Sequence, residues 1–109
     1  MIIRTIDDKF VNLNNVAKVE FNFKAADPIE IKYPFREEGE DLYDVDYPLG
    51  DVFIGETDLA KIRDWFIEAL EKNKPYFDFR DAYINIFDSS AEKIDAMECI
   101  ERIYGEKNN

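Results

Sequence analysis

Residues 57–73 carry the pattern that most restricts the fold, because their apolar side chains recur at steps of three and four. This spacing places them on one side of an α-helix, with charged side chains on the opposite side. The apolar side contains Leu59, Ile62, Phe66, Ala69 and Leu70. Such a helix must pack against an apolar surface, which we expect to be a sheet built from residues 2–54. Thr57 is the expected N-cap of the helix.

The segment 1–54 predicts an antiparallel meander, because short runs of alternating apolar and polar side chains are separated by turn residues. In the third run, Val19, Phe21 and Phe23 point one way and the polar residues between them point the other way. Residues 36–41 are expected to form a polar loop. The expected strands cover residues 2–6, 10–13, 16–23, 29–33, 43–47 and 52–54.

The last third of the chain predicts one more strand and a second helix. We interpret residues 76–81 as an aromatic connector that packs back onto the core, and residues 82–87 as a strand. Ser89 and Glu92 then match a capping box, in which each side chain satisfies a backbone N–H group of the other residue. The second helix is expected over residues 89–104. Its expected buried side chains are Ala96, Met97, Ile100, Ile103 and Tyr104.

Together these elements predict one α+β domain over residues 1–109, with an antiparallel meander sheet of five to seven strands and two amphipathic helices packed on it. Hydrophobic residues make up 46% of the chain, which makes wholesale disorder unfavourable. The first residues lack the pattern of a signal peptide, and no apolar run approaches the ~20 residues that a membrane helix requires. A single cysteine, Cys99, cannot form an internal disulfide, so we expect a cytoplasmic protein.

Acidic side chains are concentrated in one stretch of the chain. The net charge is −11 at pH 7, and residues 37–58 contain nine acids and no base. Such a surface repels phosphates and anionic membranes, so direct binding to nucleic acid or to a membrane surface is disfavoured. A basic protein is the class of partner that this charge favours.

The sequence lacks the residue patterns of the common catalytic sites. The chain has no histidine, which excludes Ser-His-Asp and Cys-His catalysis and the usual Cys/His zinc sites. Gly-rich phosphate-binding loops and the G-x-S-x-G motif are also missing. We interpret Cys99 as a half-buried structural residue. We therefore expect no enzymatic activity and no cofactor; an acidic hydrolase would need a cleft that holds two carboxylates.

The leading hypothesis is a non-enzymatic protein-interaction module that presents the acidic stretch 37–58 to a partner. Complementary charge speeds association and selects partners. In one version, the acidic surface imitates nucleic acid and inhibits a basic protein. The alternatives are a solvated face that keeps the sheet from aggregating, and a homodimer formed through an exposed edge strand. The candidate partner-binding residues are Glu37, Glu38, Glu40, Asp41, Asp44, Asp46 and Asp51.

A divalent-cation-binding domain is the alternative from another functional class. Asp44 and Asp46 share one face of a predicted strand roughly 7 Å apart, because side chains repeat every second residue. Together with Glu38, Glu40 or Asp51, they would supply the oxygen ligands that calcium and magnesium prefer. The segment does not match the D-x-[DN]-x-[DN]-G spacing of a calcium-binding loop.

Two short stretches carry a resemblance to known proteins. Residues 10–16, Phe-Val-Asn-Leu-Asn-Asn-Val, and residues 54–57, Ile-Gly-Glu-Thr, resemble a set of small uncharacterised bacterial proteins. In that set, a strand with the pattern N-L-x-x-V opens a meander, and a strand ending near G-E leads into an amphipathic helix. The acidic segment 37–51 and the helix from Ser89 depart from that pattern. The order of elements is also similar to pleckstrin-homology-like folds, without their basic lipid-binding loops. The resemblance implies an architecture and a bacterial source, and no activity.

Overall fold

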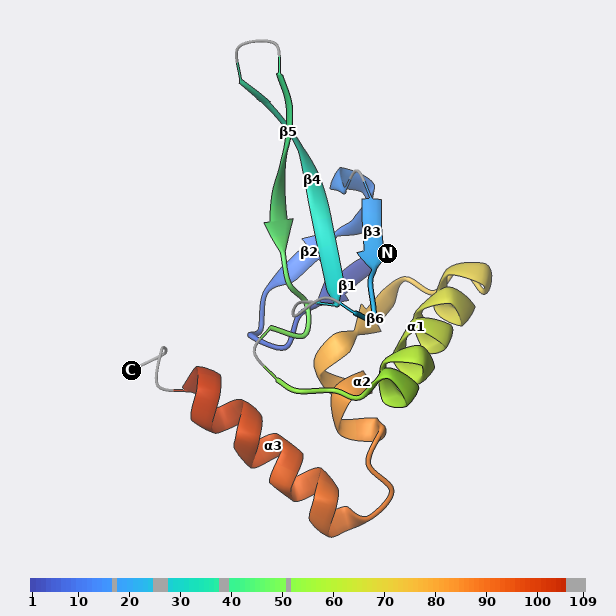
Figure 1. Cartoon of the computed structure of the whole chain (residues 1–109). Coiled ribbons are helices and arrows are strands. Elements are labelled where there is room, and N and C mark those ends of the chain that lie inside the picture. Colours follow the sequence, from blue (N-terminus) through green and yellow to red (C-terminus); the bar gives the residue numbers. More distant parts are fainter. Residues whose placement is uncertain (17, 25–27, 38–39, 51, 106–109) are drawn as a thin grey trace.

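The computed structural model describes residues 1–16, 18–24, 28–37, 40–50 and 52–105, with the backbone alone for residues 34–37 and 40–44. In chain order the elements are β1 (Ile2–Arg4), β2 (Phe10–Asn12), the 3-10 helix η1 (Leu13–Asn15), β3 (Lys18–Phe21), β4 (Ile29–Glu37), β5 (Glu40–Asp46), α1 (Glu56–Glu71), β6 (Tyr76–Asp78), α2 (Phe79–Asn85) and α3 (Ser90–Tyr104). The described residues form an α+β structure, which confirms the predicted class (Figure 1). The expected single meander with two helices is corrected: in these residues there are two three-stranded sheets and three α-helices.

The first sheet joins segments that lie far apart in the sequence. Its strand order is β2-β1-β6, and β1 pairs antiparallel with β2 and parallel with β6. Parallel neighbours need a long crossover connection, which the chain between β1 and β6 provides. Residues 76–78 were expected in an aromatic connector, and they are instead a strand. Pairing with β1 satisfies backbone groups that a connector lying on the core would leave without partners.

The second sheet has the order β3-β4-β5 and is antiparallel. The β4–β5 ladder runs from Ile31 opposite Asp46 to Glu37 opposite Glu40, and it projects away from the helices (Figure 1). The expected polar loop over residues 36–41 is wrong at both ends, because strand pairing includes residues 36, 37, 40 and 41. Backbone hydrogen bonds extend these strands beyond the apolar alternation from which their ends were predicted.

Helix α1 confirms the helix expected over residues 57–73, with its bounds shifted to Glu56–Glu71. Leu59, Ile62 and Phe66 are buried, as their spacing predicts. Leu70 was expected in the same buried stripe and is 40% exposed. It borders a shallow cavity with Met1 and Leu13, so the closed core does not reach the last turn of α1.

The start of α1 differs from the predicted cap. Gly55 occupies the N-cap position, and no side chain accepts a hydrogen bond from the first turn, so the predicted Thr57 cap is wrong. Glu56 and Asp58 lie in the first turn instead, where a carboxylate interacts favourably with the positive end of the helix dipole. Residues 52–54, expected as a short strand, have no regular structure and lead directly into this turn.

Phe66 of α1 connects the two sheets through aromatic contacts. Its ring centroid lies 6.2 Å from that of Phe21 on β3 in the second sheet. On the other side it lies 5.2 Å from Phe77 of β6 and 5.4 Å from Phe79 of α2. The expected packing of α1 against strand residues such as Phe21 is therefore confirmed, and Phe66 belongs to one core cluster that includes residues of both sheets.

Helix α2 replaces the strand expected over residues 82–87. Phe79, Ala82, Tyr83 and Ile86 recur at helical spacing, and all four are buried. The alternation that suggested a strand depended on Ile84 and Ile86, but a run this short fits both periods. The N-cap of α2 selects the helix, because the carboxylate of the preceding aspartate accepts a hydrogen bond from its first turn.

The start of helix α3 confirms one half of the predicted capping box, since the Ser89 hydroxyl accepts a hydrogen bond from the Glu92 N–H at 3.1 Å. Ala96, Ile100 and Tyr104 are buried, as expected. Met97 was also expected inside and is 50% exposed, because it lies outside the buried positions of α3, which recur every four residues. None of the helices in the described chain is both long and apolar enough to cross a lipid bilayer.

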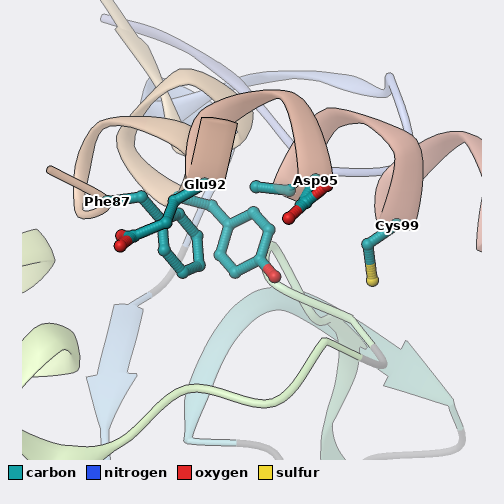
Figure 2. A pocket seen from close by; sticks show the side chains of 6 residues that line it. Phe87, Glu92, Asp95 and Cys99 are labelled. Carbon is teal, nitrogen blue, oxygen red and sulfur yellow. The ribbon is translucent and has the colours of Figure 1, made fainter. Parts of the chain in front are cut away.

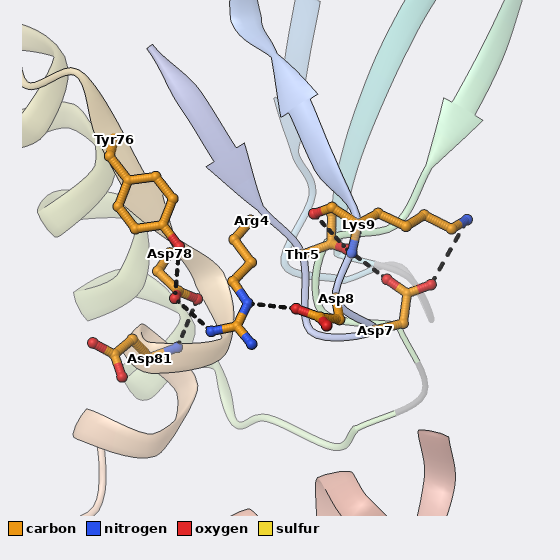
Figure 3. A network of polar contacts seen from close by, with 8 residues as sticks. All are labelled: Arg4, Thr5, Asp7, Asp8, Lys9, Tyr76, Asp78 and Asp81. Carbon is orange, nitrogen blue, oxygen red and sulfur yellow. Dashed lines mark hydrogen bonds and ion pairs between the residues drawn. The ribbon is translucent and has the colours of Figure 1, made fainter. Parts of the chain in front are cut away.

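One aspartate joins β1, β6 and the start of α2 through polar contacts (Figure 3). Asp78 accepts a hydrogen bond from the Asp81 backbone N–H at 3.0 Å, which caps α2. Its other oxygen accepts from Arg4 Nη1 at 3.1 Å and from the Tyr76 hydroxyl at 3.0 Å. Arg4 also contacts Asp8, at 2.7 Å. The Asp78 side chain is only 12% exposed, so its contact with Arg4 is partly shielded from solvent.

Candidate interaction surface

The structure places the predicted acidic residues around the β4–β5 ladder. The pairing of residue 36 with Asp41 and of Glu37 with Glu40 brings these acids to one end of the ladder. Asp44 and Asp46 lie further along β5. Glu38 and Asp51 lie outside the described residues. The description covers only the backbone of Glu37, Glu40, Asp41 and Asp44.

Asp46 holds β5 to its neighbours. The Tyr33 hydroxyl donates a hydrogen bond to Asp46 Oδ2 at 2.7 Å, and Lys9 Nζ lies 3.5 Å from Asp46 Oδ1. Both carboxylate oxygens therefore have partners within the chain. In the part of the chain that the structure describes, no three Cys, Asp or Glu side chains gather in a way that could hold a metal ion.

Alkaline pH should destabilise the fold through Tyr33. Burial raises the pKa of Tyr33, and its hydrogen bond to Asp46 and the charge of that carboxylate raise it further. Above pH ~10 the unfolded chain therefore loses a proton that the folded chain keeps. The contribution to stability is full below pH ~10 and decreases above it, by less than about 1.4 kcal/mol per pH unit because solvent screens a partly exposed group.

Urea unfolding at a series of pH values from about 8 to about 11.5 measures this decrease. Tyr33→Phe removes the titrating group, so its stability should fall less steeply with pH than that of the parent chain. Parallel stability curves for the two chains would contradict the assignment.

The segment after β5 contains an apolar feature that the sequence does not reveal. Phe53 is 93% exposed, the highest value among the large apolar side chains that the structure describes. It borders a groove of about 520 Å³ whose lining includes Phe23, Pro28, Val52, Ile54 and Leu59. Residues 52–54 were expected to form a short, fully apolar strand, which gave no indication of this exposure. A run of three apolar residues between turn residues does not distinguish a strand from an exposed loop.

Charged side chains surround this groove. Glu56 lines it directly, and Asp58 in the same helical turn lies 3.7 Å from Lys61. The guanidinium of Arg63 lies 5.0 Å from the ring centroid of Phe23, which lines the groove, within range of a cation–π contact. The groove therefore combines an apolar lining with one carboxylate, and one of its rings, Phe23, already contacts a cation of the chain. No protein-family model, curated protein or solved structure matches the chain.

Proposed function

We propose that the protein is a non-enzymatic interaction module that binds a basic, amphipathic segment of another protein through residues 37–58. The observation that carries this proposal is Phe53, which is 93% exposed beside an apolar groove. Phe53 lies within the same stretch that holds nine acids and no base. Glu56 lines the groove beside Phe53, and the other acids of the stretch extend the negative field along the β4–β5 ladder. An apolar side chain flanked by lysine or arginine complements such a surface.

The apolar part of this surface supplies affinity. Burying a phenylalanine side chain that is otherwise in water stabilises a complex by about 1.5–3 kcal/mol. Aromatic side chains that enter pockets near the centre of an interface commonly dominate its energy. The groove beside Phe53, at about 520 Å³, is large enough to receive apolar side chains of the partner.

The charged part of the surface raises the rate of association with a basic partner and favours such partners over others. A field of one sign raises the association rate of an oppositely charged partner and repels partners of the same sign. The pairing of Glu37 with Glu40 at the projecting end of the β4–β5 ladder places acids where an approaching partner meets them early (Figure 1). Rim charges of this kind act mainly on the association rate, whereas the apolar anchor acts mainly on dissociation.

Phe53→Ser should weaken binding of a fluorescent synthetic peptide of alternating leucine and lysine by about tenfold, because the buried anchor is lost. Fluorescence anisotropy measures the affinity. Phe10→Ser is the matched control: Phe10 is 63% exposed on β2, outside the acidic stretch, so the same substitution there should change the affinity less than about twofold. Equal effects of the two substitutions would contradict the proposed surface.

The charge component has its own variant. Glu37→Gln, Glu40→Gln and Asp41→Asn combined should slow association of the same peptide by about tenfold at low salt, and rising ionic strength should remove the difference. Asp64→Asn, Glu71→Gln and Glu98→Gln combined remove three acids elsewhere on the chain and serve as the control. Association that is insensitive to salt, or slowed equally by both triple variants, counts against the acidic surface.

A further inference from the structure

A second cavity lies between α2 and α3, apart from the Phe53 groove (Figure 2). It is an open depression of about 310 Å³, which is near the lower end of the size range of small-molecule sites. Such a volume suits a small head group on a short chain. Its lining consists of Tyr83, Phe87, Glu92, Asp95, Ala96 and Cys99.

Two aromatic rings form one wall of this cavity. Tyr83 lies on α2, and Phe87 follows it by four residues, which brings both side chains to the same side of the chain. Their ring centroids are 5.4 Å apart and their planes meet at 90°. Tyr83 is only 5% exposed, so the half-buried Phe87 offers most of the accessible ring surface, and a cation is attracted to the negative face of such a ring.

Two carboxylates from α3 lie opposite this wall. Glu92 and Asp95 are three residues apart, so they project from neighbouring positions on one side of the helix. Figure 2 shows them and Cys99 directed to the same side of α3. Neither carboxylate has a side-chain hydrogen bond or an ion pair with another residue whose side chain the structure describes. Both are therefore available to an occupant.

The remaining polar group of the wall is neutral. Burial raises the pKa of the Tyr83 hydroxyl, and the adjacent Cys99 thiol raises it further. At neutral pH the tyrosine ring therefore keeps its proton, and the charge in the cavity comes from Glu92 and Asp95. An anion is excluded by these two carboxylates, and a hard metal ion is disfavoured because aromatic carbon makes up much of the remaining lining.

We infer that this cavity binds an alkylammonium group, with the cation held between the Tyr83–Phe87 wall and the carboxylates of Glu92 and Asp95. The source is either a lysine side chain of a protein or a free amine, since both carry the same head group. The inference does not depend on the proposed Phe53 groove, because no residue lines both cavities. A protein that binds its partner elsewhere, or not at all, would still bind alkylammonium here.

A choline titration followed by amide chemical shifts tests the inference. Saturable shifts are expected at Tyr83, Phe87, Glu92 and Asp95, with an affinity in the millimolar range. The uncharged analogue dimethylbutanol, in which carbon replaces the quaternary nitrogen, should bind at least about fivefold more weakly, because one exposed cation–π contact contributes about 0.5–1 kcal/mol and the carboxylates add to it. Equal affinity for the two probes would overturn the inference.

Two sets of variants separate the cavity from the general charge of the chain. Glu92→Gln combined with Asp95→Asn should weaken choline binding at least about fivefold, since both carboxylates are lost. Asp88→Asn combined with Glu98→Gln removes the same charge near the start and in the middle of α3 without altering the lining, and should leave the affinity within about twofold. Thermal melts of both pairs verify folding. Equal weakening by both pairs would show only a non-specific charge effect and would overturn the site.

The same titration with trilysine and with spermidine distinguishes the sources. Tighter binding of trilysine, with shifts centred on the cavity, assigns the site to a lysine side chain, whereas tighter binding of spermidine assigns it to a free polyamine. Absence of localised shifts with all of these amines would refute the inference while leaving the Phe53 groove untouched.

Discussion

Replacing Phe66 by Ala should lower the free energy of unfolding by about 3–5 kcal/mol, the range for truncating a buried phenylalanine. Phe66 is 3% exposed, so the substitution leaves a cavity in the core. It also removes three ring contacts, with Phe21 in one sheet, Phe77 in the other and Phe79 in α2. Because these ring contacts reach both sheets, the loss should weaken the coupling between them. Urea unfolding measures the free energy, and hydrogen exchange in β3 and β1 reports the coupling.

Ile67→Ala is the matched control for this prediction. Ile67 follows Phe66 in the same helix and is 42% exposed, so its truncation should cost less than about 1 kcal/mol. If Phe66→Ala and Ile67→Ala destabilised the chain equally, the side chain of Phe66 would not connect the sheets. If Phe66→Ala left amide hydrogen exchange in β3 unchanged and accelerated it in β1, other side chains would connect the two sheets.

The helices with long periodic patterns could be predicted from the sequence. In α1, apolar side chains recur over about three turns, and a strand cannot bury that pattern on one face. In α3, the Ser89 cap and the buried positions Ala96 and Ile100 followed from the same spacing. These features are local, since each depends on residues within a few turns of one another.

The sheet arrangement could not be predicted because it depends on pairing between distant residues. The parallel pairing of Ile3 with Phe77 has no local signal, and it turns an apparent connector into a strand. This pairing also determines the structure of the next residues. Asp78 ends the new strand and caps a helix, so residues 79–85 form α2. An alternation of five residues from Tyr83 to Phe87 was too short to indicate the difference.

The sequence predicts the charge of the candidate interaction surface, and it does not predict the apolar part of that surface. The concentration of acids in residues 37–58 can be counted directly from the sequence. Exposure of Phe53 depends on where the chain leaves β5 and enters α1, and this path is set by tertiary packing. The aromatic and acidic cavity between α2 and α3 was missed for a related reason: Tyr83 and Phe87 were assigned to a strand, whose geometry would separate them from Glu92 and Asp95.

Asp78→Ala should destabilise the protein by about 2–4 kcal/mol, because three interactions end at this carboxylate. Loss of a helix N-cap costs about 1 kcal/mol, and a shielded hydrogen bond to a charged partner contributes about 1.5–3 kcal/mol. The substitution also leaves the Arg4 guanidinium, whose side chain is 29% exposed, without its less exposed partner. Thermal and urea unfolding measure the change.

Two further variants divide this effect into its parts. Asp78→Asn keeps an oxygen that can cap α2 and removes the charge that faces Arg4, so it should cost about half as much as Asp78→Ala. Asp8→Asn removes the more exposed partner of Arg4, and asparagine tolerates the positive φ of 67° at that position, so it should cost less than about 1 kcal/mol. If Asp8→Asn matched Asp78→Ala, the junction of β1, β6 and α2 would depend on the exposed ion pair. Asp78 ends β6 and caps α2. We therefore expect its contacts to contribute more to stability than the exposed Arg4–Asp8 pair.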